Sequence, residues 1–228
     1  MKKNNYKILN LYACLGGNRY KWDEVTDVEV TAVELDPAAA ELYQERFPND
    51  KVYVGDAHKY LLDHYKEFDF IWSSPPCPTH SIARAYNSKY ETLYPDLKLY
   101  EEIILLKNVS NGQTPRFKGK FVVENVIPYY EPLIPAHKRH RHLYWTNFNL
   151  PNILTTRKVL IGESKKNVIS NELNNLCEFH DYDFNKYKGK QSKTKMARNL
   201  VDYEAGKTIL ETALNIQRAN NTEQLTIL

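Results

Sequence analysis

The segment Asp69–Cys77 ends an apolar run with two prolines and a cysteine, and such a cysteine could act as a nucleophile. Phe68–Trp72 is short and apolar at most positions, which predicts a buried strand of a parallel sheet. Pro75 and Pro76 cannot continue the hydrogen-bond ladder, so the chain must turn away where the strand ends. Because open α/β sheets place their active sites at that edge, Cys77 is expected in a cleft. The alternative is a buried, inert thiol, which is common for isolated cysteines.

Two segments upstream of Cys77 have the composition of a cofactor site. Asn10–Gly17 overlaps the end of the apolar segment Ile8–Tyr12, and its paired glycines would let the backbone approach a nucleotide-like ligand. Val30–Pro37 predicts a second strand that ends in acidic residues. A carboxylate about 20 residues after such glycines is the usual acceptor for ribose hydroxyls, and Glu34 is the candidate, with Asp36 beside it.

Two more carboxylates accompany apolar segments. In Val52–Ala57, Asp56 could accept the exocyclic amine of an adenine. In Lys120–Val126, Glu124 interrupts an apolar strand, where a half-buried carboxylate is costly unless it is used or paired. Burial would raise its pKa toward the range of a general acid at neutral pH. Asp56, like Glu34, could instead be a solvated loop charge, but the spacing of these acids together predicts a sheet that binds an adenosine-containing cofactor.

The basic segment Pro135–Trp145 follows these acids. Arg139 and Arg141 alternate, so on a strand both side chains would lie on one face. A solvated basic loop is the alternative. The neighbouring histidines lack a Cys or carboxylate set at ligand spacing, so we expect no metal site.

The ordered segments resemble those of the S-adenosylmethionine-dependent DNA cytosine-5 methyltransferases. The segments that carry this resemblance are Ala13–Gly17, Glu34, Gly55–Asp56, Pro75–Cys77, Glu124–Val126, and Arg139 with Arg141. They span most of the first 145 residues. The resemblance implies an α/β fold, a Rossmann-like class I methyltransferase sheet with helices on both faces and a small, short target-recognition segment.

The resemblance also implies roles for individual residues. The expected catalytic residues are Cys77 as nucleophile, Glu124 as the acid at the cytosine ring, and Arg139 and Arg141 at the target base. Glu34 would bind the cofactor ribose, Asp56 its adenine, and the glycine turn its methionine end. The full set expected at S-adenosylmethionine is Tyr12, Ala13, Cys14, Gly16, Gly17, Glu34, Leu35, Asp56, Ala57 and Pro75. The residues expected to contact the nucleic acid are Ser81, Arg84, Asn125, Lys188, Lys190 and Lys193.

The chemistry of such a reaction requires these residue types. Attack of a thiolate on C6 of cytosine turns C5 into a nucleophile, and an acid at N3 assists that attack. The target base must be flipped out of duplex DNA. Three positions depart from the family pattern. Cys14 stands where a glycine is usual, His137 replaces a glutamine, and Arg198–Val201 only partly matches a Gly-Asn-(small)-Val segment.

We expect residues 1–146 to form the catalytic and cofactor-binding core. Residues 147–194 would form a short target-recognition segment, 195–219 a C-terminal helix returning to the core, and 220–228 a tail. Helices are predicted over Ala38–Arg46, His58–Tyr65, Asp96–Asn108 and Tyr203–Arg218. Residues 78–95 would be either a mobile loop that closes over the flipped base or an ordered surface loop.

Charge is unevenly distributed along the 228 residues. Residues 1–115 carry 13 basic and 17 acidic side chains, net −4, and the remainder carries 18 and 11, net +7. A lysine cluster in the basic half could contact phosphates or could be a solvated loop. The cluster comprises Lys186, Lys188, Lys190, Lys193 and Lys195.

The partner expected from these features is double-stranded DNA, with a helper subunit as an option because the recognition segment is short. A monomer is favoured. The absence of a signal peptide or long apolar stretch predicts a soluble, cytoplasmic protein without a membrane partner. The compact size would suit a stand-alone enzyme of bacterial or viral origin, for which a restriction-modification system is one setting. An RNA cytosine-5 methyltransferase and an inactive methyltransferase-fold binding partner remain alternatives. An exocyclic-amine methyltransferase would usually have an aromatic residue where Cys77 stands.

Overall fold

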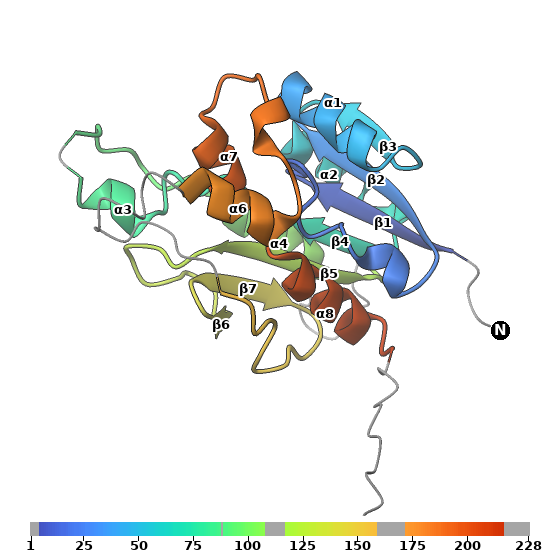
Figure 1. Ribbon diagram of the computed structural model, residues 1–228. Helices are drawn as coiled ribbons and strands as arrows, with labels where there is room; N and C mark the ends of the chain where they lie inside the picture. Colours follow the sequence, from blue (N-terminus) through green and yellow to red (C-terminus); the bar gives the residue numbers. More distant parts are fainter. Residues whose placement is uncertain (1–4, 88, 108–116, 159–171, 217–228) are drawn as a thin grey trace, which may run out of the picture.

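The computed structural model describes residues 5–87, 89–107, 117–158 and 172–216, and these form a seven-stranded sheet (Figure 1). The strand order is β3-β2-β1-β4-β5-β7-β6. β1 to β5 pair in parallel, whereas β7 runs antiparallel to β5 and β6 antiparallel to β7. The strands are β1 (Tyr6–Leu11), β2 (Val28–Glu34), β3 (Lys51–Val54), β4 (Phe70–Ser73), β5 (Lys120–Val126), β6 (His137–Arg139) and β7 (His142–Thr146).

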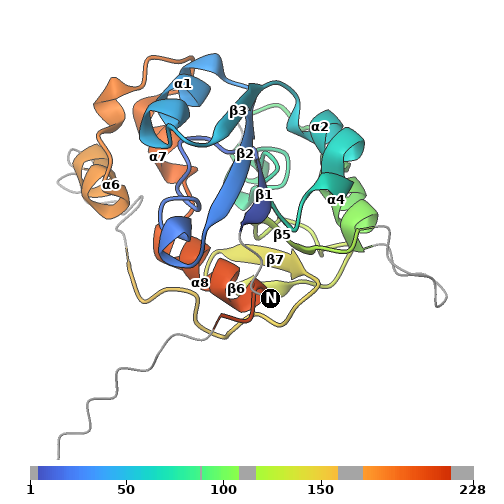
Figure 2. The same ribbon diagram turned by 90° about the vertical axis from the view of Figure 1, so that its right-hand side faces the viewer.

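Helices cover both faces of the sheet (Figure 2). α2 and α4 lie on one face, and α8 lies on the other. The α-helices are α1 (Pro37–Arg46), α2 (Ala57–His64), α3 (Ile82–Ala85), α4 (Lys98–Lys107), α6 (Glu172–His180), α7 (Lys193–Arg198) and α8 (Tyr203–Ala213). Short 3₁₀ turns are η1 (Trp22–Glu24), η2 (Tyr65–Glu67) and η3 (Phe184–Lys186). The α/β fold with a mainly parallel sheet, expected from the sequence, is confirmed.

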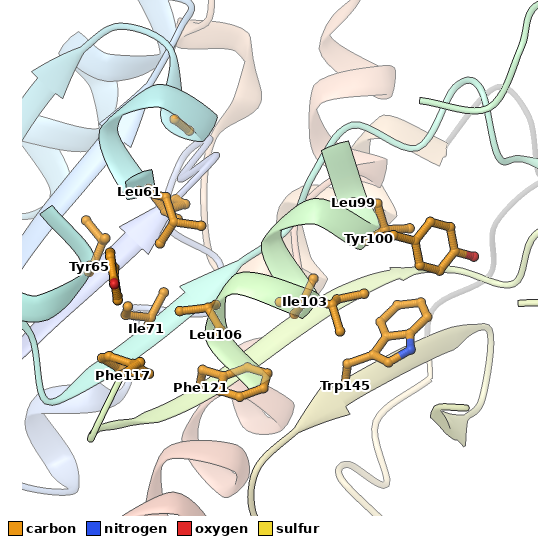
Figure 3. Packing of buried hydrophobic residues seen from close by; sticks show 14 of the residues in the cluster. Leu61, Tyr65, Ile71, Leu99, Tyr100, Ile103, Leu106, Phe117, Phe121 and Trp145 are labelled. Carbon is orange, nitrogen blue, oxygen red and sulfur yellow. The ribbon is translucent and has the colours of Figure 1, made fainter. Parts of the chain in front are cut away.

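Two apolar layers hold the sheet between its helices. On the α2 and α4 face, side chains of these helices pack on β4 and β5; Figure 3 shows Leu61, Ile71, Ile103 and Phe121 among them. On the opposite face, α8 and Trp22 of η1 pack on Phe70 and Trp72. The four residues of β4 are fully buried, as expected for a central parallel strand covered on both faces.

The loops after β2 and β3 begin helices in the same way. Asp36 caps α1 by accepting a hydrogen bond from the amide of Ala38, and Pro37 occupies the first helical position. Asp56 caps α2 by accepting from the amides of His58 and Lys59. Carboxylates in these positions satisfy amides that have no partner within the helix. Both acids therefore lie at the carboxyl edge of the sheet.

Several predicted boundaries shift. The strand predicted over Phe68–Trp72 is β4, which starts two residues later and includes Ser73. The helix predicted over Tyr203–Arg218 ends at Ala213, close to Asn215 with a φ of 54°, and residues 217–228 lie outside the described residues. The helix predicted over Asp96–Asn108 spans Lys98–Lys107, and position 108 is likewise outside them. Residues 78–95 contain the short helix α3.

The placement predicted for the two arginines is wrong. Arg139 is the last residue of β6, but Arg141 lies in the turn between β6 and β7. His140, which precedes it, has a φ of 50°. This left-handed residue reverses the chain, so the alternation that would align both side chains on one strand face is broken.

The segment that contains α6, η3 and α7 packs against the loop after β1 and against α1. Leu176, Phe184 and Met196 share a buried cluster with Leu15 and Ala39. This segment is coloured orange to red-brown beside α1 in Figure 1. The domain limits set out from the sequence remain predictions, and residues 159–171 within the expected recognition segment lie outside the described residues.

Candidate active site

The turn that carries Cys77 is fixed by the neighbouring strand. After β4, the side-chain amide of Asn125 on β5 donates a hydrogen bond to the carbonyl of Pro75 at 3.0 Å. The carbonyl of Cys77 then accepts hydrogen bonds from the amides of His80 and Ser81, both at 3.0 Å. The thiol is partly exposed at the carboxyl edge of the sheet. Cys77 thus sits on a braced turn at the strand end.

Glu124 lies beside this turn and is held from two directions. The hydroxyl of Ser74 donates to Glu124 Oε2 at 2.9 Å. His142 Nε2 lies 3.4 Å from Glu124 Oε1. In the antiparallel pairing Glu124 faces Tyr144 and Val126 faces His142, so His142 reaches Glu124 diagonally across one sheet face. Glu124 is buried, and these partners offset the cost of burying a carboxylate.

Electrostatics couple Cys77 to two charged residues. Burial raises the pKa of the Cys77 thiol, and the nearby negative charge of Glu124 raises this pKa further. The positive charge of Lys195 on α7 lowers the pKa of the same thiol. Cys77 and Glu124 are therefore close enough to affect each other, and the C-terminal segment (residues 172–216) contributes to the same site. No sequence pattern marks this role for Lys195 beyond its place in the lysine cluster.

The loop after β1 has an unusual backbone. Tyr12 and Cys14 have φ values of 55° and 49°, in the left-handed region that costs non-glycine residues about 1–3 kcal/mol each. Glu34 stabilises this loop: its Oε2 accepts from the amide of Cys14 at 2.8 Å, and its Oε1 accepts from the amide of Asp36 at 2.8 Å. Burial raises the pKa of Glu34, and the amide hydrogen bonds oppose that rise.

The two glycines of this loop are required by protein packing. A Cβ on Gly16 would lie 2.3 Å from Phe47 Cε2, and Gly16 also has a φ of 68°. A Cβ on Gly17 would lie 2.5 Å from the carbonyl oxygen of Val201. From the sequence we expect these glycines to make room for a ligand, whereas the contacts that exclude a side chain here come from the end of α1 and from the C-terminal segment.

The ends of β2 and β3 carry exposed apolar side chains that could contact an adenosine group. Leu35 is 70% exposed, and Tyr53 and Val54 are each 51% exposed. Exposed apolar side chains next to Glu34 and Asp56 offer a flat base an apolar contact with carboxylates at its border. The oxygens of Glu34 keep further lone pairs beyond those used by the amides. The residues expected at S-adenosylmethionine that are buried include Ala13, Ala57 and Pro75.

The guanidinium group of Arg139 donates hydrogen bonds to backbone carbonyls. Its Nε donates to the carbonyl of Pro151 at 2.6 Å, and Nη2 donates to the carbonyl of Leu150 at 3.1 Å. Nη1 donates to the carbonyl of Lys138. Arg139 therefore fastens β6 to the segment after β7 in this conformation, and the structure gives no contact between it and Cys77 or Glu124 in the described part of the chain. Its expected role at the base stays a prediction.

The residues expected at the nucleic acid fall in separate places. Ser81 and Arg84 lie just after the Cys77 turn, and Asn125 braces that turn. Lys186 and Lys188 line a shallow surface cavity with Leu42 and Glu45 of α1. Lys193 begins α7, and Lys190 is exposed between η3 and α7. Of the lysine cluster, Lys195 is the member whose charge is felt at Cys77.

A buried carboxylate network next to the site was not anticipated. Glu102 on α4 is fully buried and accepts from Tyr12 Oη and from Ser73 Oγ, both at 2.6 Å. His58 Nδ1 lies 3.0 Å from the same carboxylate, and this hydrogen bond raises the pKa of His58. The network ties together the ends of β1 and β4 and the start of α2. A sequence signal exists: Leu99, Glu102 and Leu106 share the buried face of α4.

Comparison with known proteins identifies this arrangement. A family model for the C-5 cytosine-specific DNA methylase matches residues 6–126, more than half of the chain. The chain belongs to the C-5 cytosine-specific DNA methylase family. The matched range contains Cys77, Glu34 and Glu124, whereas Arg139 and the lysine cluster lie beyond it. None of the curated proteins matches the chain.

Two solved structures show the same fold as this methylase chain. The Entamoeba histolytica methyltransferase EhMeth has 10% identity and a TM-score of 0.53, over 93% of this chain and 99% of that one. The S. pombe Dnmt2 methyltransferase has 10% identity and a TM-score of 0.53, over 92% and 98%. At this identity the likeness establishes the fold alone. It is consistent with the class I methyltransferase architecture expected from the sequence.

None of the described helices is long and apolar enough to cross a membrane. Within the same residues, no three His, Cys, Asp or Glu side chains gather so that they could hold a metal ion.

Proposed function

We propose that this methylase transfers a methyl group from S-adenosylmethionine to C5 of a cytosine in DNA, through a covalent adduct with Cys77. The proposal rests on one observation: the braced Cys77 turn lies beside Glu124, with Asn125 holding the turn and Ser74 holding the carboxylate. A nucleophile and an acid at neighbouring strand ends are what addition to a pyrimidine ring needs. Family membership supports the reaction class, and the nucleic acid is our inference.

In this mechanism Cys77 supplies the nucleophile. Its thiolate adds to C6 of the flipped cytosine, and the electron pair moves to C5. Glu124 donates a hydrogen bond or proton at ring nitrogen N3, which favours the addition. C5 then takes the methyl group and S-adenosylhomocysteine leaves. A base from solvent removes the C5 proton, and that electron pair re-forms the C5–C6 double bond and expels the Cys77 thiolate, while the N3 proton returns to Glu124 and 5-methylcytosine is released. Ser74 and His142 hold Glu124 in the position this requires.

S-adenosylmethionine would supply the methyl group. Glu34 would bind the ribose hydroxyls with its remaining lone pairs, and Leu35 and Val54 would contact the adenine. The loop after β1 would lie along the methionine end. These residues are supported by their place at the carboxyl ends of β1 to β3, where open α/β sheets bind such groups.

Nucleoside mass spectrometry tests the proposal. Unmethylated duplex DNA, single-stranded DNA and RNA of the same sequence are incubated with the protein and S-adenosylmethionine. We expect 5-methylcytosine in DNA. Methylation of RNA alone would show that the substrate is RNA and not DNA. Formation of N4-methylcytosine or N6-methyladenine would refute the Cys77 mechanism. No product on any strand would favour a binding role or a missing partner subunit.

Trapping tests the nucleophile separately. DNA containing 5-fluorocytosine should form a covalent complex that denaturing electrophoresis detects, because fluorine at C5 cannot leave as a proton would. Cys77→Ser should abolish the complex, and Cys177→Ser should not. A complex that survives Cys77→Ser would show that another residue attacks the ring.

A further inference from the structure

A second cavity lies directly beside the Cys77 turn. It has a volume of about 210 Å³. Its lining consists of Pro78, Thr79, Ser81, Arg84, Ala85, Tyr86, Tyr90, Glu91, Thr92, Leu93 and Tyr129. The first two of these residues follow Cys77 in the chain, and Tyr129 follows the strand that carries Glu124. The cavity is therefore lined by residues that come directly after Cys77 and by a residue that comes shortly after β5.

Backbone contacts fix this cavity relative to the catalytic turn. Ser81 forms a bridge with Pro128, and the amide of Tyr129 donates to the carbonyl of His80 at 3.1 Å. The amide of Ser81 in turn donates to the carbonyl of Cys77. A ligand in the cavity would thus lie against the same short segment that positions the thiol.

The lining has the chemistry of a site for a flat, polar-edged ring. Tyr90 is 54% exposed and Tyr86 is 82% exposed, so both aromatic side chains are accessible to a ligand in the cavity. The guanidinium carbon of Arg84 lies 5.0 Å from the centroid of the Tyr90 ring. Aromatic rings together with an arginine form the surfaces on which unpaired nucleobases stack.

Arg84 retains hydrogen-bonding capacity. Its Nη2 donates to the carbonyl of Glu91 at 3.3 Å, and its Nε has no hydrogen-bond partner among the described residues. Buried donors without an acceptor are rare, so a ligand that brings an acceptor would satisfy this one. The cavity is also smaller than the 300–1,000 Å³ typical of sites for drug-sized ligands, which suits a single ring.

We propose that this cavity, the Tyr90 pocket, binds the nucleobase next to the target cytosine. The proposal rests on the proposed function, because it takes the target to be held at Cys77. A neighbouring base can enter only if it is unstacked and unpaired. The pocket therefore selects single-stranded or looped nucleic acid over a fully paired duplex, and the shared ligand is an unpaired base of either DNA or RNA.

Binding measurements test the pocket without relying on turnover. Fluorescence anisotropy is recorded with S-adenosylhomocysteine and short single strands of DNA or RNA that contain one cytosine. In matched strands the base on the 5′ side or the 3′ side of that cytosine is replaced by an abasic residue. We expect one abasic position to weaken binding to the wild type roughly five- to hundred-fold, the range expected for loss of one stacked base.

Variants of Tyr90 test whether this loss of affinity arises in the pocket. Tyr90→Ala should weaken binding of the intact strand by a similar factor and make the abasic substitution nearly neutral. Tyr90→Phe keeps the ring and should behave like the wild type. Tyr94→Ala removes a tyrosine that is 95% exposed and outside the lining, so it controls for nonspecific effects. The DNA and RNA arms show which strand the pocket prefers.

Two results would overturn the proposal. One is equal affinity of the wild type for intact and abasic strands. The other is an abasic penalty in Tyr90→Ala as large as in the wild type. Methyl transfer is followed in parallel: absence of 5-methylcytosine on every strand would count against the proposed function, whereas the abasic comparison alone decides the pocket.

Discussion

At the scale of single residues, the thiol of Cys77 is controlled by charges of opposite sign. Burial and Glu124 both raise its pKa, and Lys195 lowers it. The free protein therefore holds Cys77 largely as the protonated thiol at neutral pH, since even an ordinary thiol is mostly protonated there. Formation of the thiolate then depends on the bound substrate and on a rise in pH.

Alkylation of Cys77 by iodoacetamide measures this balance. The rate in the wild type should rise with pH through a midpoint above that of an ordinary thiol, because its pKa is raised. Glu124→Gln removes a negative charge and should accelerate alkylation roughly two- to five-fold at about pH 7.5; Lys195→Gln should slow it by a similar factor. Peptide mass spectrometry separates Cys77 from Cys14 and Cys177. If the alkylation rate of Cys77 changed in the same direction in both variants, this electrostatic account would be contradicted.

The hydroxyl of Ser74 is expected to act through Glu124. Its hydrogen bond at 2.9 Å orients the carboxylate, and loss of a hydrogen bond to a charged group costs about 1.5–3 kcal/mol. Ser74→Ala should therefore lower kcat about ten- to hundred-fold and leave KM for S-adenosylmethionine within about two-fold. Steady-state kinetics check this split. An equal effect on cofactor binding would instead show that Ser74 shapes the cofactor site.

At the scale of elements, the part of the chain from α6 to Leu200 packs against the loop after β1 and against α1, where we propose that the cofactor binds. The hydroxyl of Tyr187 donates to Asp36, the cap of α1, and burial together with Asp36 raises the pKa of Tyr187 to about 12. Met196 and Leu200 pack in the same cluster as Leu15 of the loop after β1. The stability of this segment and the shape of the loop after β1 are consequently linked.

Two tyrosine variants test this link. Tyr187→Phe removes a buried hydrogen bond to a carboxylate and should lower the free energy of unfolding by about 1.5–3 kcal/mol. Tyr182→Phe is the matched control, since its buried hydroxyl has no hydrogen-bond partner among the described residues, and its removal should be neutral or slightly stabilising. Urea denaturation gives both values. Equal destabilisation by the two variants would mean that the Asp36 contact contributes little.

The same elements show how far the sequence could lead. The strand ending at the prolines, the capping acids and the apolar strand around Glu124 each carry a local pattern, and the predicted order of elements through β5 is the observed one. Arg141 was misplaced because a left-handed histidine is not visible in strand periodicity. The proximity of His142 to Glu124, and of Lys195 to Cys77, depends on a strand pairing and on a returning segment. No local pattern encodes either.

At the scale of the whole molecule, the charge asymmetry divides the chain into an acidic half and a basic half. The acidic half contributes β1 to β4 and the helices α1 to α4, whereas the basic half contributes β5 to β7 and the C-terminal segment. Lys195 brings one charge of the basic half to Cys77. If Lys188, Lys190 and Lys193 contact phosphates, the basic half is the side on which the nucleic acid lies.

Salt dependence of binding tests this assignment. Phosphate contacts release counterions, so the logarithm of the association constant should fall linearly with the logarithm of the salt concentration. Replacing Lys188, Lys190 and Lys193 together by Gln should reduce that slope by about 0.7–0.9 for each phosphate that is no longer neutralised. Replacing Lys59 and Lys107, exposed on α2 and α4, should leave the slope unchanged. In contrast, binding of a base in the Tyr90 pocket should change little with salt concentration, because it depends on stacking. If the triple replacement does not alter the slope, the three lysines form a solvated surface and do not contact phosphates. The phosphate contacts would then lie nearer Cys77, and Arg84 and Lys195 would be the next residues to replace.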